Sequence, residues 1–161
     1  MFRPMRRSKQ ALPDEEIQRI LESCTDGVLA VAGDDGFPYA VPLNYVLADR
    51  TVYFHTAKEG HKVDAIRREP KVTFTVVEKR DIVEAELTTY FRSVIVFGNA
   101  RIVTDPKEHQ KALLALSNRL CPSASERVLA EELATSTHCY TVAIDILHAT
   151  GKESIELVRA R

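Results

Sequence analysis

The order of apolar and polar residues divides the chain into a β-rich part and several short amphipathic helices. Apolar residues recur on one helical face between positions 17 and 24, directly after a proline and three acidic residues that are typical of a helix start. Runs rich in branched side chains follow at 28–32, 39–47 and 51–56, separated by turn residues. The pattern therefore predicts one helix followed by a meander of three strands.

The rest of the chain repeats these two patterns. Ser123 and Glu126 have the spacing of a capping box, which marks the start of a short helix. The elements predicted here are a helix at 60–70, strands at 72–77 and 90–103, helices at 104–120 and 123–133, and a strand at 140–148.

Six strands joined mostly by tight turns do not fit a doubly wound parallel sheet, which needs a crossover helix after nearly every strand. We therefore predict a mainly β fold with short helices, built as a six-stranded antiparallel barrel. No internal repeat or linker-like stretch divides the sequence, so residues 1–161 are expected to form a single domain. Residues 1–10 are expected to be flexible.

Charge and hydropathy exclude two classes of partner. With 22 Lys and Arg against 23 Asp and Glu, the net charge of −1 gives no basic field for a nucleic-acid backbone or an anionic membrane. The longest charge-free run, 36–48, contains two prolines and is shorter than the roughly 20 apolar residues of a membrane helix. Basic residues within positions 3–9 resemble the start of a signal peptide, but acidic residues at 14–16 stand where its apolar run would be. We expect a cytoplasmic protein.

The cysteines and histidines do not predict a metal site. The three cysteines form no CxxC pair and cannot all be bridged within the chain, which suits a reducing compartment. The five histidines lack the short paired spacing of zinc or iron ligands. The glycine motifs of dinucleotide-binding folds, P-loops and hydrolase elbows are also missing from the sequence.

A candidate anion site lies where the strand at 51–56 ends and the next helix begins. Lys62 falls in the first turn of that helix, where the positive end of the helix dipole makes a cation unfavourable. A phosphate could accept hydrogen bonds from the Thr56 hydroxyl, the His61 backbone and the Lys62 ammonium. The same residues could equally form an ordinary solvated surface, and this segment alone does not separate the two interpretations.

Pro42 interrupts an otherwise regular strand. Because proline has no N–H to donate, one side of this backbone is not expected to pair with another strand. A flat heteroaromatic ring could accept hydrogen bonds from the free N–H groups around Leu43 and Asn44. An edge strand with a bulge accounts for the same spacing, and both interpretations stay open.

A resemblance to a known family is carried by the segments YAVPLNYV at 39–46, VYFHTA at 52–57 and GHKVDAIRR at 60–68, and continues through 93–101 and 144–153. The chain resembles the nitroimidazole-resistance branch of the pyridoxamine 5′-phosphate oxidase-like flavoproteins. The resemblance implies a split β-barrel that binds FMN at the interface of a homodimer. The residues it implies at FMN are Val41, Pro42, Leu43, Asn44 and Tyr45 along the flavin ring; Thr56, His61 and Lys62 at the phosphate; His55 and Ala57 near the ribityl chain or ring; and Arg92 and Ser93 from the partner chain.

The resemblance further implies an FMN-dependent oxidoreductase, such as a reductase of 5-nitroimidazole-like or other small compounds. No catalytic residue is assigned, although His55 is a candidate proton donor by its position. The alternative is a non-enzymatic electron carrier or flavin-responsive regulator, and a haem-binding barrel is less favoured because no histidine stands at a motif position for an axial ligand. The segment 154–161 is predicted to be an irregular tail without the further basic residues of true pyridoxamine-phosphate oxidases.

Overall fold

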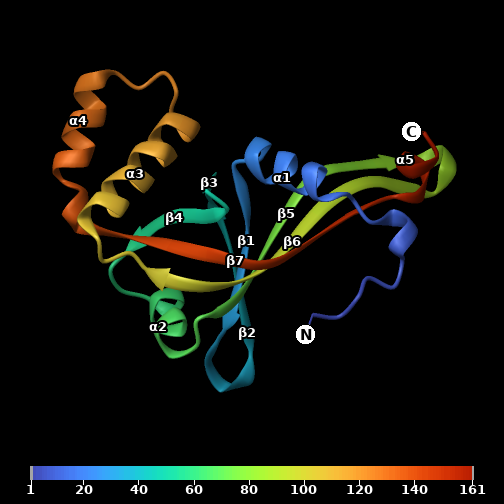
Figure 1. Ribbon diagram of the computed structural model, residues 1–161, viewed down its shortest axis with the longest axis horizontal. Coiled ribbons are helices and arrows are strands. Elements are labelled where there is room, and N and C mark those ends of the chain that lie inside the picture. Colours follow the sequence, from blue (N-terminus) through green and yellow to red (C-terminus); the bar gives the residue numbers. More distant parts are fainter. Residues whose placement is uncertain (1, 161) are drawn as a thin grey trace.

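One curled antiparallel sheet organises the fold in the computed structural model, which describes residues 2–160. In these residues the sheet has seven strands in the order β2-β1-β5-β6-β7-β4-β3. The edge strands β2 and β3 follow each other in the chain, so the sheet closes on itself as a split barrel (Figure 1). The strands are β1 (Asp26–Ala32), β2 (Pro38–Asn44), β3 (Val46–Ala48), β4 (Thr51–Ala57), β5 (Lys71–Val83), β6 (Thr88–Ile102) and β7 (Cys139–Glu153).

The mainly β class and the barrel architecture are confirmed, but the predicted number of six strands was wrong by one. The predicted strand at 39–47 is divided at Tyr45, whose side chain is completely buried. The Tyr45 hydroxyl donates to the carbonyl oxygen of Leu21 at 2.7 Å, and its backbone N–H donates to the carbonyl oxygen of Thr25 at 3.0 Å. Its ring also meets Phe74 edge-on. This residue therefore turns the chain from one sheet edge to the other.

The described part of the chain has five α-helices around the sheet: α1 (Asp14–Ser23), α2 (His61–Arg68), α3 (Pro106–Leu120), α4 (Glu126–Ala134) and α5 (Ile155–Arg159). Helix α2 lies at one end of the barrel, whereas α3 and α4 form a hairpin beside β3 and β4 (Figure 1). No helix among residues 2–160 is both long and apolar enough to cross a membrane.

Two local predictions need correction. Helix α4 is capped by Ser125 and not by Ser123, because the Ser125 hydroxyl accepts a hydrogen bond from the N–H of Val128. The tail predicted to be irregular contains the short helix α5, which begins directly after β7. The expected flexibility of residues 1–10 stays a prediction, and Met1 lies outside the described residues.

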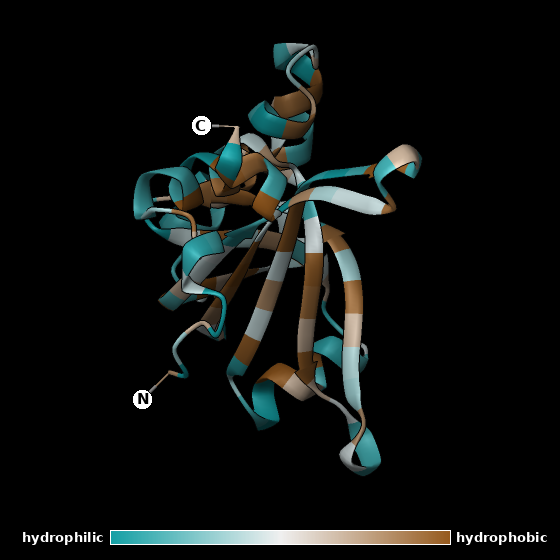
Figure 2. Cartoon of the chain, turned by 90° about the vertical axis from the view of Figure 1, so that its right-hand side faces the viewer, coloured by the Kyte–Doolittle hydropathy of each residue, from teal (hydrophilic) through white to brown (hydrophobic). Residues whose placement is uncertain are grey.

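The two faces of the sheet differ in character, and Figure 2 shows polar and apolar residues alternating along the long strands. On β6, Val94 and Val96 are completely buried in the barrel, whereas Ile95 and Phe97 point to the outer face. Successive side chains of a strand point to opposite faces, so this assignment fixes the orientation of the whole strand. The outer face keeps a row of partly exposed apolar side chains.

Helix α3 owes its start to a local cap that can be tested. The Asp105 carboxylate accepts hydrogen bonds from the N–H groups of Lys107 and Glu108 at 3.2 and 3.3 Å. We expect Asp105→Ala to lower the free energy of unfolding by about 1 kcal/mol, measured by urea denaturation. Asp64→Ala, which removes an exposed carboxylate 3.9 Å from Arg67, is the control and should change stability less. Equal stability of the Asp105 variant and the wild type would contradict the assigned cap.

Candidate functional site

The start of α2 is set by the backbone of Gly60. This residue has φ of +124°, a conformation that residues with a Cβ rarely adopt, and it lets the chain turn from the end of β4 into the helix. No side chain caps the first turn of α2. The first N–H groups of the helix are therefore open to an external acceptor.

Lys62 lies in this first turn and is half-buried. Among residues 2–160, no side chain forms an ion pair or hydrogen bond with its ammonium, and burial lowers the pKa of Lys62. The Thr56 side chain, near the end of β4, is buried on the inner face of that strand, and its hydroxyl makes no hydrogen bond within the same residues. A cation without a partner at the positive end of a helix favours a bound anion.

His61 is held by two residues that the sequence analysis did not select. Its ring stacks on the Tyr39 ring with 4.1 Å between the centroids, and its Nε2 lies 3.5 Å from Oδ2 of Asp34. The Asp34 carboxylate also accepts a hydrogen bond from Arg68. The start of β2 and the start of α2 therefore meet, so the two candidate segments lie side by side. The resemblance segment already contained Tyr39, but no pattern in the sequence pointed to Asp34.

Strand β2 is an edge strand, as the interpretation of Pro42 requires. Its exposed side chains alternate with half-buried ones: Pro38, Ala40, Pro42 and Asn44 are exposed, and Tyr39, Val41 and Leu43 are half-buried. The side chains of Val41 and Leu43 pack against the core, and Tyr45 lies within it. A ring placed on this strand would therefore meet the outer side chains and the free backbone edge. The Tyr45 side chain is completely buried, so only its backbone could face a ring on this strand, and its place at the flavin stays a prediction.

Residues of β4 divide between the two faces of the sheet. His55 and Ala57 point outward and are exposed, whereas Thr56 points inward. His55 lies opposite Thr141 of β7 in the strand register. The side chains of His55 and Thr56 therefore cannot contact the same atom of a small ligand from one side.

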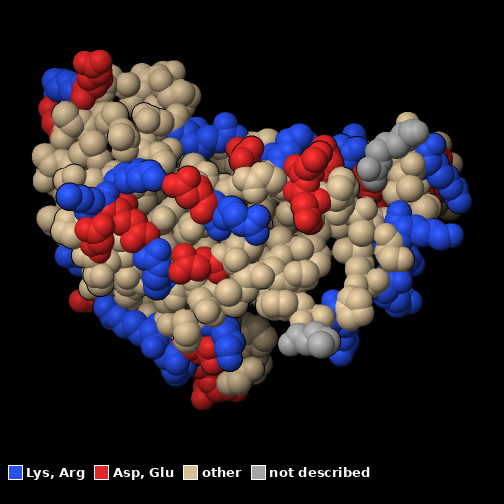
Figure 3. Space-filling view, in the orientation of Figure 1, with Lys and Arg blue, Asp and Glu red and all other residues tan. Residues whose placement is uncertain are grey.

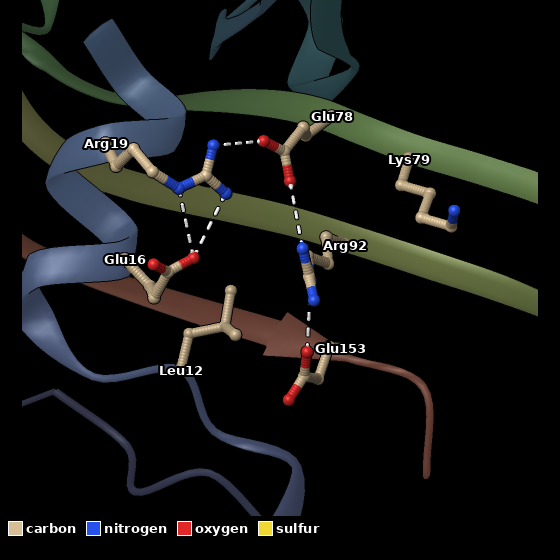
Figure 4. A pocket seen from close by; sticks show the side chains of 7 residues that line it. All are labelled: Leu12, Glu16, Arg19, Glu78, Lys79, Arg92 and Glu153. Carbon is tan, nitrogen blue, oxygen red and sulfur yellow. Dashed lines mark hydrogen bonds and ion pairs between the residues drawn. The ribbon is translucent and has the colours of Figure 1, made fainter. Parts of the chain in front are cut away.

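Arg92 and Ser93 lie on the β5–β6–β7 arm, away from α2 (Figure 1). Figure 4 shows Arg92 within a chain of ion pairs that joins α1 to this arm, around a cleft of about 570 Å³. Its Nε donates to the buried Glu153 carboxylate at 3.0 Å, and Arg19 bridges Glu16 and Glu78. Ser93 lies on the opposite, outer face. Within one chain the structure does not bring these two residues to the other candidates, and Arg92 is engaged by its own chain.

The outer face of the sheet is apolar over several strands. Two rows of residues face each other in register across β1, β5, β6 and β7. A bulge beside Gly98 leaves Leu147 without a partner in the strand register and exposed. Gly98 itself allows a close approach of β7, because a Cβ there would lie 2.6 Å from the Asp145 carbonyl oxygen. The rows are Val28, Thr75, Ile95 and Thr150, and Ala30, Thr73, Phe97 and His148. Val28, Ile95 and Leu147 are exposed on this face, and exposed apolar side chains grouped in this way are typical of an interaction surface.

The geometry gives less support to a metal site or a reactive cysteine. Within residues 2–160, no group of three or more His, Cys, Asp or Glu side chains is arranged to hold a metal ion. Burial raises the pKa of the thiols of Cys24 and Cys139, which disfavours the reactive thiolate form.

Comparisons with known proteins extend over most of the chain. The family model described as pyridoxamine 5′-phosphate oxidase matches residues 13–153. A candidate 5-nitroimidazole antibiotic resistance protein from Bacteroides thetaiotaomicron is similar in structure, with a TM-score of 0.72 at 20% identity over 89% of this chain and 86% of that chain. A conserved hypothetical protein from Mycobacterium tuberculosis has a TM-score of 0.79 at 20% identity, covering 93% and 90% of the two chains.

A protein described as FAD-binding, from Mycobacterium smegmatis, has a TM-score of 0.63 at 23% identity and covers 89% and 96%. No curated protein matches the chain in sequence. Because each of these structures is less than 25% identical to this chain, the similarity establishes the fold alone.

Proposed function

Because this chain belongs to the pyridoxamine 5′-phosphate oxidase family, we propose that it is an FMN-dependent oxidoreductase that acts on a small molecule such as a nitroaromatic compound. The observation that carries the proposal is the half-buried, unpaired Lys62 in the uncapped first turn of α2, close to the free edge of β2. A phosphate and an aromatic ring are the two groups that these features would recognise.

The residues present fit a flavin mononucleotide. One ammonium, the buried Thr56 hydroxyl and the open N–H groups of a single helix turn suit one terminal phosphate. The exposed side of β2 offers Ala40, Pro42 and backbone groups to a flat ring. Three similar structures are described as binding FAD, one of them together with haem, so the experiment must separate FMN from FAD.

A bound flavin would supply the electron transfer, and this chain would bind and orient it. His55 is exposed on the outer face of β4 and remains the proposed proton donor. The same site would serve an electron carrier or a flavin-responsive regulator. Turnover with a reduced nicotinamide and a nitroimidazole separates an enzyme from these two.

The proposal includes a homodimer with the cofactor at its interface. The outer apolar face of the sheet, which runs from β1 to β7, supports a second copy as its cover. Ser93 lies on this face and would be the residue through which the partner approaches the cofactor. Arg92 faces α1 and would act on the site only by positioning the arm.

Purification of the full chain tests the cofactor directly. We expect a yellow protein that releases FMN, and not FAD, on denaturation, as identified by chromatography of the released flavin. Colourless protein that also fails to bind added FMN would refute the proposal.

A further inference from the structure

The basic segment at the N-terminus plays no part in the proposed flavin site, yet it is anchored at both ends. At one end the Phe2 ring stacks on the His148 ring, with 4.6 Å between centroids and 16° between planes. At the other end Ala11 pairs with Lys152, and the N–H of Leu12 donates to the Gly151 carbonyl oxygen at 3.0 Å. The residues between these anchors are therefore placed against the arm of the sheet.

A pocket of about 440 Å³ lies between this segment and α5. Figure 3 shows Lys and Arg side chains gathered over this lower right flank of the molecule. No carboxylate lines the pocket, and the three cations that do line it form no ion pair with any residue in 2–160. The lining residues are Arg6, Arg7, Ser8, Lys9, Gln10 and Ile155. Like charges this close repel one another, and an anion would relieve the repulsion.

Two further polar side chains lie in this pocket or next to one of its lining residues. Gln10 lines the pocket with 5% of its surface exposed, and its side-chain amide forms no hydrogen bond with residues 2–160. Ser154, which directly precedes the lining residue Ile155, is 2% exposed, and its hydroxyl finds no hydrogen-bond partner in the same range. Buried polar groups are nearly always hydrogen-bonded, so the Ser154 hydroxyl implies a partner from outside the chain, and the Gln10 amide is free to bind a ligand in the pocket.

We propose that this N-terminal pocket binds a phosphorylated small molecule, with Arg6, Arg7 and Lys9 at the phosphate and the Gln10 amide at a polar oxygen. Guanidinium and ammonium groups supplemented by neutral donors are the groups that bind phosphate in proteins. The pocket's volume lies within the roughly 300–1,000 Å³ of small-molecule sites, which favours such a ligand. The net charge of −1 disfavours a nucleic-acid backbone. This proposal does not depend on the flavin site.

Calorimetric titration of the full chain with inorganic pyrophosphate and with ADP tests the pocket. We expect both probes to bind the wild type. The double variant Arg6→Gln/Arg7→Gln should bind them at least about tenfold more weakly. The matched control is Lys111→Gln/Arg127→Gln, which removes the same charge from exposed side chains on α3 and α4 and should bind like the wild type. Tighter binding of ADP than of pyrophosphate would identify a nucleotide, and equal binding would identify phosphate alone.

One further variant separates this pocket from general electrostatics. Gln10→Met keeps the side-chain volume and the net charge, and it should still weaken both probes several-fold, roughly the effect of one hydrogen bond. The proposal is overturned if the wild type binds neither probe, or if the Arg6/Arg7 variant and its control bind equally.

Discussion

Lys62→Met is expected to weaken FMN binding by about 1.5–3 kcal/mol, roughly ten- to a hundredfold, because it removes a charge-assisted hydrogen bond to the phosphate. Methionine keeps the aliphatic stem, so packing around the start of α2 should persist. Fluorescence titration of the apoprotein with FMN measures the change. Lys58→Met is the matched control. It removes the same charge four residues earlier in the chain, where the Lys58 ammonium lies over the Tyr140 ring. Equal weakening in both variants, or no change in Lys62→Met, would contradict a direct contact.

The same substitution should stabilise the protein without flavin. Burial lowers the pKa of Lys62, so the folded state binds fewer protons than the unfolded state at alkaline pH, and stability rises as pH increases through that range. Below the lowered pKa the charged form is penalised on folding, and methionine removes the penalty. Urea denaturation of the apoproteins at neutral pH should therefore show Lys62→Met at least as stable as the wild type. A less stable variant would indicate a structural role for the ammonium.

Ile95→Asp is expected to dissociate the proposed homodimer and to lower FMN occupancy with it. A charge at the centre of a covered apolar face loses its hydration, which weakens association by about 3 kcal/mol or more. Val96 is buried in the barrel, so the same change there would disrupt the core instead. Sedimentation of the variant and its flavin content after gel filtration measure the two effects.

The control for this variant is Leu114→Asp on α3, because Leu114 and Ile95 are each 38% exposed in one chain. Leu114→Asp should remain dimeric and yellow. A wild type that sediments as a monomer with full FMN occupancy would refute the link between assembly and cofactor. Dissociation of both variants would place the interface elsewhere.

The local pattern of apolar and polar residues predicted most helices and strands correctly. It failed where the bounds of an element depend on contacts with residues distant in the sequence. The alternation on β6 and the acidic start of α1 are local signals, and both elements form where predicted. The division at Tyr45 depends on carbonyl groups of Leu21 and Thr25, which no window around residue 45 contains. Strand β7 runs beyond its predicted end at 148, because residues that resemble a turn pair with β6.

The candidate site was found where the sequence breaks a local rule. A lysine at a helix start and a proline inside a strand are both unfavourable without an additional partner, so each could be recognised from the sequence alone. The contact of His61 with Asp34 could not be recognised from the sequence, since it depends on the β1–β2 turn folding back to α2. The hydrogen bond from Arg92 to Glu153 likewise depends on the pairing of β6 with β7, which brings together two residues 61 positions apart in the sequence.

Pro42 also determines how the free edge of the barrel meets other protein molecules. Exposed strand edges are templates for uncontrolled pairing between chains, and this sheet ends in two of them, β2 and the three-residue β3. Because Pro42 has no N–H, an extended segment of another molecule cannot form a continuous ladder along β2. The edge thus stays open to a small ring while it is protected against edge-to-edge aggregation.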